Sequence, residues 1–389
     1  VGAGAASGAA SENGSGPSAT EVPFTQRITT YLEVPRYQLN HVTVVLPEPL
    51  APGDSLTLML DYGGYLVGYT ETGSVYIQDR VVWNRLAPYL DDAEFSILRT
   101  DALAWPEVGT LSVMANRVAP RPDFTFDTRI SVPEPWVVAT SGTLVSRTGS
   151  GGRTTFRYES RAPVPFLNIP IAKYEVLESG GVTVFHFPED GPGAERLLDR
   201  TLRGLALLES RYGPLGTEPE LTVMEIPERW GSQASLTAGI IQTADAFGET
   251  ASLRPLYHEL THLWNARDLD QPSARWTEGL ATFLSYRMAE ELDGSEVMDQ
   301  GLRRTRDGLR AAGAGQGASG EHVSAPGPAT VPFARYGQER STGLAYRTGF
   351  LMFADLFERM GAEEFDAAYR DFFQAHREDG WTFDGLVEA

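Results

Sequence analysis

The first half of the chain alternates between apolar and polar positions with a period of two, which is typical of half-buried β-strands. The alternation is clearest at residues 37–45 and 55–62, and residues 47–53 between them have the Pro and Gly of a turn. Further short strands are predicted at residues 74–77, 110–114, 124–132, 136–140, 154–160 and 169–176. Many short strands separated by Gly and Pro clusters predict an antiparallel sandwich or a saddle-shaped sheet.

Beyond residue 178 the apolar positions adopt helical spacing. The leucines of residues 194–212 recur every three or four positions, and Gly213 and Pro214 end that helix. Strands are predicted at residues 182–186, 220–226 and 239–243. Helices are predicted over the H-E-x-x-H motif, with Pro255 in the first turn, and at residues 273–292, 346–360 and 363–375, with a further helix start at Trp381 and a loop at residues 311–333. The pattern predicts an α+β protein in which an antiparallel β saddle or sandwich at residues 23–178 precedes a mostly α domain at residues 179–389.

Residues 1–22 are rich in Gly, Ala and Ser and predict a flexible tail, because such a segment buries too little apolar area to offset its ordering entropy. The tail either tethers the chain to an upstream membrane segment or lipid anchor, or is the remnant of a trimmed terminus. No run of 18 apolar residues is present, so no membrane span is expected in this chain. An extracytoplasmic location is favoured slightly over a cytoplasmic one.

Charge and cysteine content narrow the classes of function. The net charge of −20 and the pI of about 4.7 argue against nucleic-acid binding, which needs a basic face. The chain has no cysteine, which excludes disulfides and metal sites with Cys ligands. The oligomeric state is left open by the sequence.

The sequence H-E-x-x-H at residues 258–262 carries the most specific chemistry. On a helix, His258 and His262 project from one face a turn apart and can bind one metal ion. Glu278, on the next predicted helix, is the natural third ligand for one Zn²⁺ per chain. Glu259 follows the first histidine, where a general base for a zinc-bound water belongs. The alternative is an amphipathic core helix whose two histidines share a face without binding metal.

The surroundings of the motif favour a buried helix. Pro255 suits the first helical turn, and Thr250 or Ser252 is a candidate cap. The apolar positions of its buried side are Leu253, Leu256, Leu260, Leu263 and Trp264. A metal-binding helix held by such a face would present its histidines in a fixed orientation.

Several segments together resemble the aminopeptidase N family of gluzincin metallopeptidases, which includes the leukotriene hydrolases. They are HELTHLW at residues 258–264, WTEGLATF at 276–283, YRTGFLMFADLFERMG at 346–361, VPEPWVVATSGTL at 132–144 and PIAKYEV at 170–176. The resemblance implies a saddle-like β domain followed by a thermolysin-like zinc peptidase domain. It implies zinc ligands at His258, His262 and Glu278, a general base at Glu259, and an oxyanion donor at Tyr346.

The chain departs from that family at two places. The connection between His262 and Glu278 is shorter, and the string HLWN is similar to glycyl-aminopeptidase-like relatives. The family's G-x-M-E-N strand, whose Glu binds the substrate amine, has no counterpart, because Asp245 is the only acid between residues 229 and 248. Edge pairing of an extended peptide near residues 239–243 would instead use Gln233, Ser235 and Gly239 as substrate contacts.

These observations predict a zinc metallopeptidase of aminopeptidase type, with non-standard recognition of the N-terminus of a peptide or protein substrate. An α-ammonium needs a carboxylate partner, so either Glu225, Glu228 or Asp245 takes over that role, or the enzyme is an endopeptidase or a glycyl-aminopeptidase-like enzyme. A catalytically silent, zinc-containing peptide-binding module is the alternative from another class.

Overall fold

The computed structural model describes residues 20–30, 32, 38–62, 67–70, 73–76, 95–99, 111, 123–215, 220–228, 231–269, 277–294, 296–313 and 342–382. The chain divides into two compact units, Val1–Gly64 with Thr110–Met114, and Tyr65–Gly109 with Ala115–Ala389. Most of the predicted tail, most of the predicted strand at 110–114 and most of the predicted loop at 311–333 lie outside the described residues. The predicted domain boundary after residue 178 stays a prediction.

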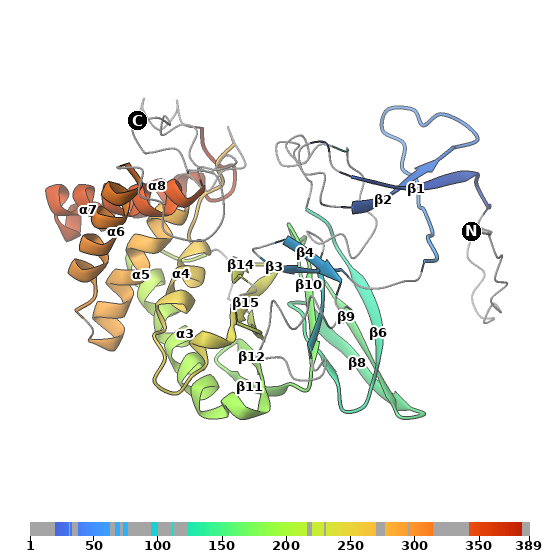
Figure 1. The fold of residues 1–389 in the computed structure, drawn as a ribbon, viewed down its shortest axis with the longest axis horizontal. Helices are drawn as coiled ribbons and strands as arrows, with labels where there is room; N and C mark the ends of the chain where they lie inside the picture. Colours follow the sequence, from blue (N-terminus) through green and yellow to red (C-terminus); the bar gives the residue numbers. More distant parts are fainter. Residues whose placement is uncertain are drawn as a thin grey trace. The chain divides into compact units, whose positions relative to one another are not determined.

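The first unit contains an antiparallel pair, β1 (Phe24–Thr30) and β2 (Gln38–Val44), drawn in blue in Figure 1. The strand predicted at 37–45 is confirmed as β2, with His41 opposite Arg27. The segment predicted as a strand at 55–62 has no ladder with any residue that the structure describes, and Met59 is 84% exposed. The described partner of β2 is β1 rather than this segment.

The second unit begins with antiparallel strands, as predicted. Their bounds are β3 (Val67–Thr70), β4 (Gly73–Tyr76), β5 (Phe95–Arg99), β6 (Asp127–Pro133), β7 (Val137–Val138), β8 (Thr143–Ser150), β9 (Arg153–Glu159) and β10 (Asn168–Ala172). β3 pairs with β4, and two three-stranded sheets have the orders β5-β10-β7 and β6-β9-β8. β3, β5 and β8 were not predicted; all eight residues of β8 are exposed, so no buried apolar face marks it as a strand.

A mixed five-stranded sheet forms the centre of the second unit. Its strands are β11 (Glu175–Ser179), β12 (Val182–His186), β13 (Leu221–Ile226), β14 (Gln233–Ser235) and β15 (Gly239–Thr243). In the order β11-β12-β13-β15-β14, the three central strands are parallel and both edge strands are antiparallel to their neighbours. Every residue of β13 and β15 is buried, as expected for strands covered on both faces.

Six helices are present in the described part of the chain, which confirms the α+β class. They are α3 (Gly191–Tyr212), α4 (Arg254–His262), α5 (Thr277–Asp293), α6 (Met298–Gly313), α7 (Thr342–Met360) and α8 (Ala362–His376). The sequence pattern did not predict α6, which is dominated by polar residues. At the predicted helix start, Trp381 forms a bridge with Asp268, and residues beyond 382 are not described.

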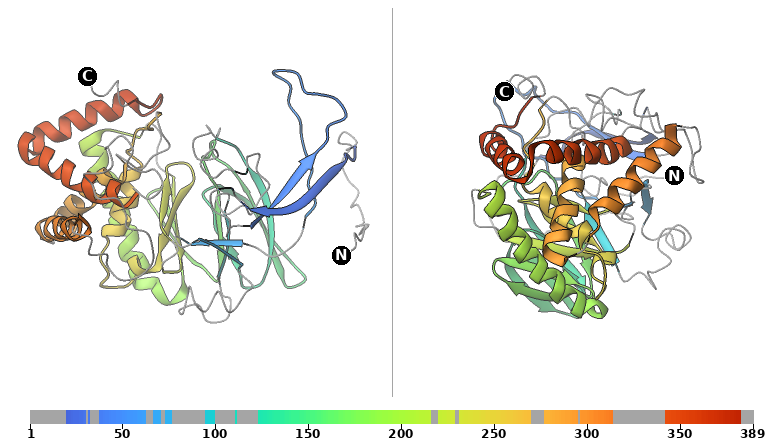
Figure 2. Two further views of the ribbon diagram at one scale, coloured as in Figure 1. Left: turned by 45° about the horizontal axis from the view of Figure 1, so that its top comes forward. Right: turned by 90° about the vertical axis from the view of Figure 1, so that its left-hand side faces the viewer.

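Three apolar clusters hold the layers of the second unit together. The helices pack on one face of the mixed sheet through residues such as Leu256, Leu260 and Trp264. The other face packs on Phe95 and neighbouring residues of the β5-β10-β7 sheet. Within the second unit, Figures 1 and 2 show the helices on one side of the mixed sheet and the sheets β5-β10-β7 and β6-β9-β8 on the other. In this arrangement α4 packs against β14 and β15. No helix in the described part of the chain combines the length and apolarity needed to cross a membrane.

Candidate metal centre

The helix α4 carries the H-E-x-x-H sequence, and Pro255 lies in its first turn as predicted. The predicted cap at Thr250 or Ser252 is wrong: the N-cap is Leu253, without a side-chain cap, although the backbone N–H of Arg254 donates to Oγ of Ser252 at 3.4 Å. The predicted apolar side is buried: Leu253, Leu256, Leu260, Leu263 and Trp264 are each 6% exposed or less. Since that face is fixed in the core, His258 and His262 are held on the side that faces α5.

The structure brings His258, His262 and Glu278 together. Nε2 of His258 lies 3.0 Å from Oε2 of Glu278 and 3.1 Å from Nε2 of His262. Nε2 of His262 lies 3.5 Å from the same Glu278 oxygen. These side chains are 13–18% exposed, so the group is mostly buried but accessible. It is the only such group of three or more potential ligands among the residues that the structure describes.

The spacing of the three atoms fits a zinc ion. A tetrahedral Zn²⁺ with His nitrogen and carboxylate oxygen ligands at about 2.0–2.2 Å separates those atoms by about 3.3–3.5 Å. The observed separations of 3.0, 3.1 and 3.5 Å lie close to that range. Two imidazoles and one carboxylate also match the ligand set of catalytic zinc sites, which keep a fourth position for water.

The charges within the group favour metal-binding forms of two of the three side chains. Burial lowers the pKa of His258, which favours the neutral imidazole that coordinates a cation. Burial also acts to lower the pKa of His262, but the interaction with Glu278 outweighs it and raises that pKa. Burial acts to raise the pKa of Glu278, yet the two imidazoles hold it far below its ordinary value. Glu278 is therefore a carboxylate over the whole neutral range.

Glu259 and Tyr346 lie beside the three ligand candidates. Glu259 is 7% exposed, and its charge contributes to the raised pKa of His262, which places it within electrostatic reach of the group. Tyr346 is on α7 and is 38% exposed. Its ring is stacked on that of His258, with centroids 5.9 Å apart and planes 14° apart. Both residues therefore lie close to the ligand candidates, Tyr346 on the exposed side and Glu259 in the buried part of α4.

A close crossing of α5 and α7 explains the position of Tyr346. A Cβ on Gly279 would lie 2.5 Å from Cα of Gly349 and 3.0 Å from the backbone oxygen of Ala345. Only a residue without a side chain permits this approach. Gly279 follows Glu278 in sequence, and Ala345 precedes Tyr346, so the crossing carries the third ligand candidate and the tyrosine to the same place.

Sequence reasoning missed one partner of the centre. Nδ2 of Asn265 lies 2.7 Å from Nδ1 of His262. When Nε2 of a histidine faces a metal, Nδ1 carries the proton, and a rotated Asn265 amide presents its oxygen to accept it. Asp268, farther along the same connection, forms a backbone bridge with Trp381. The available signal was the position of Asn265, three residues after His262.

The three predicted substrate contacts lie on or next to the edge strand β14. Oε1 of Gln233 accepts a hydrogen bond from Asn168 at 3.1 Å, and Oγ of Ser235 accepts one from the Ala238 backbone at 3.4 Å. Gly239 has φ +74°, and a Cβ there would lie 2.7 Å from the Thr222 oxygen, so its packing alone requires glycine. Contact of these residues with a substrate stays a prediction.

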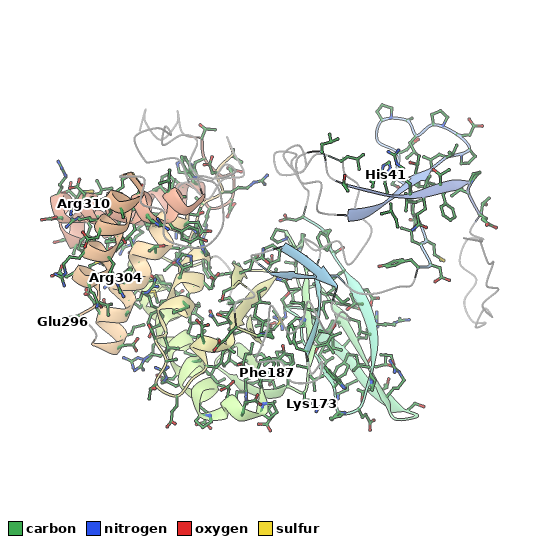
Figure 3. The ribbon with its side chains drawn as sticks, viewed as in Figure 1. His41, Lys173, Phe187, Glu296, Arg304 and Arg310 are labelled. Atoms are coloured by element: carbon green, nitrogen blue, oxygen red, sulfur yellow. The ribbon has the colours of Figure 1, made fainter. Side chains whose placement is uncertain are left out.

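Glu225 is not a suitable anchor for a substrate amine. It is fully buried, and its Oε2 accepts the backbone N–H of Phe187, which is labelled in Figure 3, at 2.6 Å. Burial, with the nearby acids Asp190 and Glu189, raises its pKa to about 10. A neutral carboxyl inside the core offers no charge to an ammonium group. Asp245 is exposed and accepts a hydrogen bond from the Thr243 hydroxyl.

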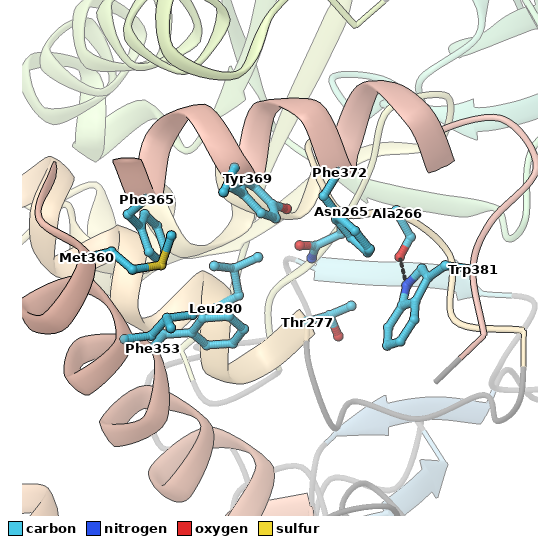
Figure 4. Close-up of a pocket in the computed structure, with 12 residues that line it drawn as sticks. Asn265, Ala266, Thr277, Leu280, Phe353, Met360, Phe365, Tyr369, Phe372 and Trp381 are labelled. Carbon is cyan, nitrogen blue, oxygen red and sulfur yellow. Dashed lines mark hydrogen bonds between the residues drawn. The ribbon is translucent and has the colours of Figure 1, made fainter. Parts of the chain in front are cut away.

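An apolar cavity of about 260 Å³ lies among α5, α7, α8 and Trp381 (Figure 4). Its walls include Leu280 and Thr277 of α5, and Nε1 of Trp381 donates to the Ala266 oxygen at its rim. Leu280 is two residues beyond Glu278 and therefore projects from nearly the opposite side of α5. Asn265, whose side chain contacts His262, also lines the cavity, so the cavity reaches the surroundings of the metal centre.

Comparisons with known proteins support the fold. No protein-family model and no curated protein sequence matches the chain. Among solved structures, the M1 zinc metallopeptidase of Deinococcus radiodurans is 19% identical, with a TM-score of 0.51 over 95% of this chain and 78% of that one. A variant of that enzyme bound to the substrate Tyr-Ser-Ala gives the same identity and TM-score over 79% of its own length. Leukotriene A4 hydrolase from Saccharomyces cerevisiae is 16% identical; its TM-score of 0.49 is too low to support an argument about the fold. The expected resemblance is therefore confirmed at the level of the fold.

Proposed function

We propose that this chain is a zinc-dependent metallopeptidase that hydrolyses peptide bonds. The observation that carries the proposal is the convergence of His258, His262 and Glu278 to within 4.8 Å of one another, at separations that suit one zinc ion. The fold shared with M1 zinc metallopeptidases supports the same conclusion. Zn²⁺ is the implied cofactor, bound by two imidazole nitrogens and one carboxylate oxygen.

The chain's own residues supply the proton transfers of the reaction. Zinc, when bound, would polarise the scissile carbonyl and lower the pKa of water at its open position to about 7. Glu259 would accept a proton from that water and then deliver it to the nitrogen of the leaving amine. The phenolic O–H of Tyr346 would donate a hydrogen bond to the substrate oxygen on which negative charge develops. These roles use the two residues that lie close to the ligand candidates.

We interpret the second half of the chain as a thermolysin-like catalytic domain. The supporting features are the mixed sheet with an antiparallel edge strand and the two successive helices, α4 and α5, that carry the ligand candidates. The α4 helix packs on β14, so an extended peptide added to the outer edge of this strand would run past the zinc helix. Gln233 and Ser235 would then contact the substrate.

The sequence of the edge strand β14 also indicates how the substrate's N-terminus would be recognised. Its sequence, Gln233 to Ser235, contains no acid that could bind an α-ammonium group. We therefore propose an aminopeptidase-type enzyme with non-standard recognition of the substrate terminus; an endopeptidase or glycyl-aminopeptidase-like activity is the alternative in the same class. Glu228 and Asp245 remain candidates for an amine partner. An extracytoplasmic location stays part of the proposal and is testable by cell fractionation.

A catalytically silent, zinc-containing peptide-binding module is the candidate from another class. The presence of Glu259 beside the ligand candidates favours an enzyme, since a scaffold has no use for a general base there. The deciding experiment is the substitution Glu259→Gln, which preserves shape and removes the base. We expect the variant to retain one zinc ion per chain and to lose peptide hydrolysis by several orders of magnitude.

Peptide libraries analysed by mass spectrometry provide the assay, with and without a zinc chelator. Cleavage by the unmodified chain that a chelator stops and zinc restores would support the proposal. Unchanged cleavage by Glu259→Gln, or no cleavage of any peptide by the zinc-loaded chain, would overturn it. Comparing acetylated peptides with their free-amine forms then separates endopeptidase from aminopeptidase action.

A further inference from the structure

A polar cavity of about 500 Å³ lies at the N-terminal end of α4. It is bounded by α3, residues 250–254, the second half of α5, and α6. Four arginines line it, Arg196, Arg200, Arg254 and Arg304, together with a single acid, Asp293. In a chain of net charge −20, four arginines around one cavity are an unusual local excess of positive charge.

The single acid is already engaged. Oδ1 of Asp293 accepts a hydrogen bond from Nε of Arg200 at 2.9 Å, and its Oδ2 accepts one from the Tyr257 hydroxyl at 2.9 Å. Arg200 is paired a second time, with Asp199 at 2.6 Å. Arg200 and Asp293 therefore neutralise one another. Among the residues that line the cavity, no second acid balances the charges of the other three arginines.

Those three arginines have no salt bridge with any acid in the described part of the chain. Nη2 of Arg196 donates to two backbone oxygens of the loop before α4, and its buried Nε has no hydrogen-bond partner there. The Arg254 guanidinium lies 4.6 Å from the centre of the Tyr286 ring and reaches only a hydroxyl. Arg304, labelled in Figure 3, is exposed on α6. Arg254 and Arg304 thus keep most of their donor hydrogens for an anion.

We infer that this cavity binds the phosphate group of a small organic phosphate. A guanidinium group can donate two parallel hydrogen bonds to two oxygens of one phosphate. Several arginines that line one cavity are therefore a common way to bind a phosphate group. The positive end of the α4 dipole and the hydroxyls of Thr250 and Ser252, which line the same cavity, add donors. The volume exceeds the needs of a bare phosphate ion and lies within the range of about 300–1,000 Å³ for small-molecule sites.

The cavity adjoins the proposed metal centre but includes none of its ligand candidates. Arg254 is one helical turn before His258 on the same face of α4 and is close enough for its charge to act on that imidazole, whereas Arg196, Arg200 and Arg304 come from α3 and α6. Phosphate bound by a metal ion would not depend on Arg304, which lies on α6. Binding at the arginine cavity can therefore be distinguished from binding at the zinc by substitutions on α6.

The test uses the full, zinc-loaded chain at low ionic strength, with binding of inorganic phosphate and of glycerol 3-phosphate followed by phosphorus NMR. Arg304→Gln and Arg254→Gln are expected to weaken binding of both probes by about tenfold each, the effect of losing one charge-assisted contact. Arg303→Gln is the matched control, since Arg303 is exposed on the same helix but does not line the cavity. It should bind both probes as the unmodified chain does.

Three outcomes would overturn the inference. They are equal binding by Arg304→Gln and the unmodified chain, succinate binding as tightly as the phosphates, and inorganic phosphate binding as tightly as glycerol 3-phosphate. The first places the anion elsewhere, the second removes the preference for phosphate, and the third removes the organic part. Because Arg304 is exposed, its variant is expected to fold, so the test does not depend on Arg254→Gln, whose ring contact contributes to packing.

Discussion

The phenol ring of Tyr346 lies nearly parallel to the imidazole of His258, with 5.9 Å between their centroids. The two residues come from different helices, α7 and α4, and are far apart in sequence. The stacking fixes the tyrosine beside the ligand candidates without making it a ligand. This position suits a hydrogen-bond donor to charge that develops next to a metal ion.

Replacing Tyr346 by Phe removes the hydroxyl and keeps the ring. We expect kcat for peptide hydrolysis to fall by about 10²–10³, the usual effect of losing one oxyanion donor, with zinc content unchanged. Steady-state kinetics and metal analysis on the same samples measure both quantities. A kcat within a factor of two of the unmodified chain would rule out the proposed role.

Replacing Asn265 by Ala removes the partner of His262 Nδ1. We expect zinc affinity to fall by about 10–100-fold, as for other groups that orient a metal-bound histidine. Competition with a chromogenic chelator gives the dissociation constant directly. Asn265→Asp keeps an acceptor oxygen and serves as control: it should retain most of the affinity lost in Asn265→Ala.

Replacing Glu225 by Gln removes a buried acid whose pKa is raised from 4.5 to about 10 by burial. In the unmodified chain, Glu225 keeps its proton in the folded state at pH values where the unfolded state releases it. Glu225 therefore makes the free energy of unfolding fall as pH rises from about 4.5 toward 10. We expect Glu225→Gln to match the unmodified chain near the low end of that range. At pH 8 it should be more stable by about 1 kcal/mol or more.

Urea unfolding at several pH values measures the difference between the two proteins, in which the contribution of the metal centre cancels. Glu178→Gln, on the exposed edge strand β11, is the control and should show no such trend. A constant difference across the pH range would show that Glu225 is ionised in the core, contrary to the raised pKa.

Replacing Gly279 by Ala introduces a Cβ 2.5 Å from Cα of Gly349. We expect the free energy of unfolding to fall by about 1–3 kcal/mol, the range for overpacking, because α5 and α7 must move apart. The movement should also lower kcat, since Glu278 and Tyr346 are adjacent to the contact. Gly308→Ala is the matched control: its Cβ meets nothing within 4 Å on exposed α6, and it should stabilise the chain by about 0.5–1 kcal/mol.

The sequence was most informative where one pattern dominates over a whole element. The leucine spacing of α3 predicted that helix with nearly correct bounds, and the strand predicted at 239–243 matches β15. The H-E-x-x-H spacing predicted that His258 and His262 share one face of a helix. Each of these inferences needs only local geometry, so the tertiary structure did not have to be known.

Other features depend on contacts that no local pattern encodes. β8 has no buried residue and is a strand only because β9 pairs with it. The segment 55–62 alternates well but has no ladder in the described part of the chain. The raised pKa of Glu225 and the arginine cavity likewise arise from residues distant in sequence. The sequence-based candidate Glu225 was wrong as an amine anchor, because its burial and raised pKa arise from residues distant in sequence.

The backbone contact between Gly279 and Gly349 has a consequence for any motion of the centre. Because α5 and α7 touch there without intervening side chains, Glu278 and Tyr346 should move as one rigid body. A conformational change that admits substrate or releases product would then shift this helix pair against α4, which carries Glu259. Widening of the site would separate the base from the oxyanion donor while the donor and the third ligand keep their spacing.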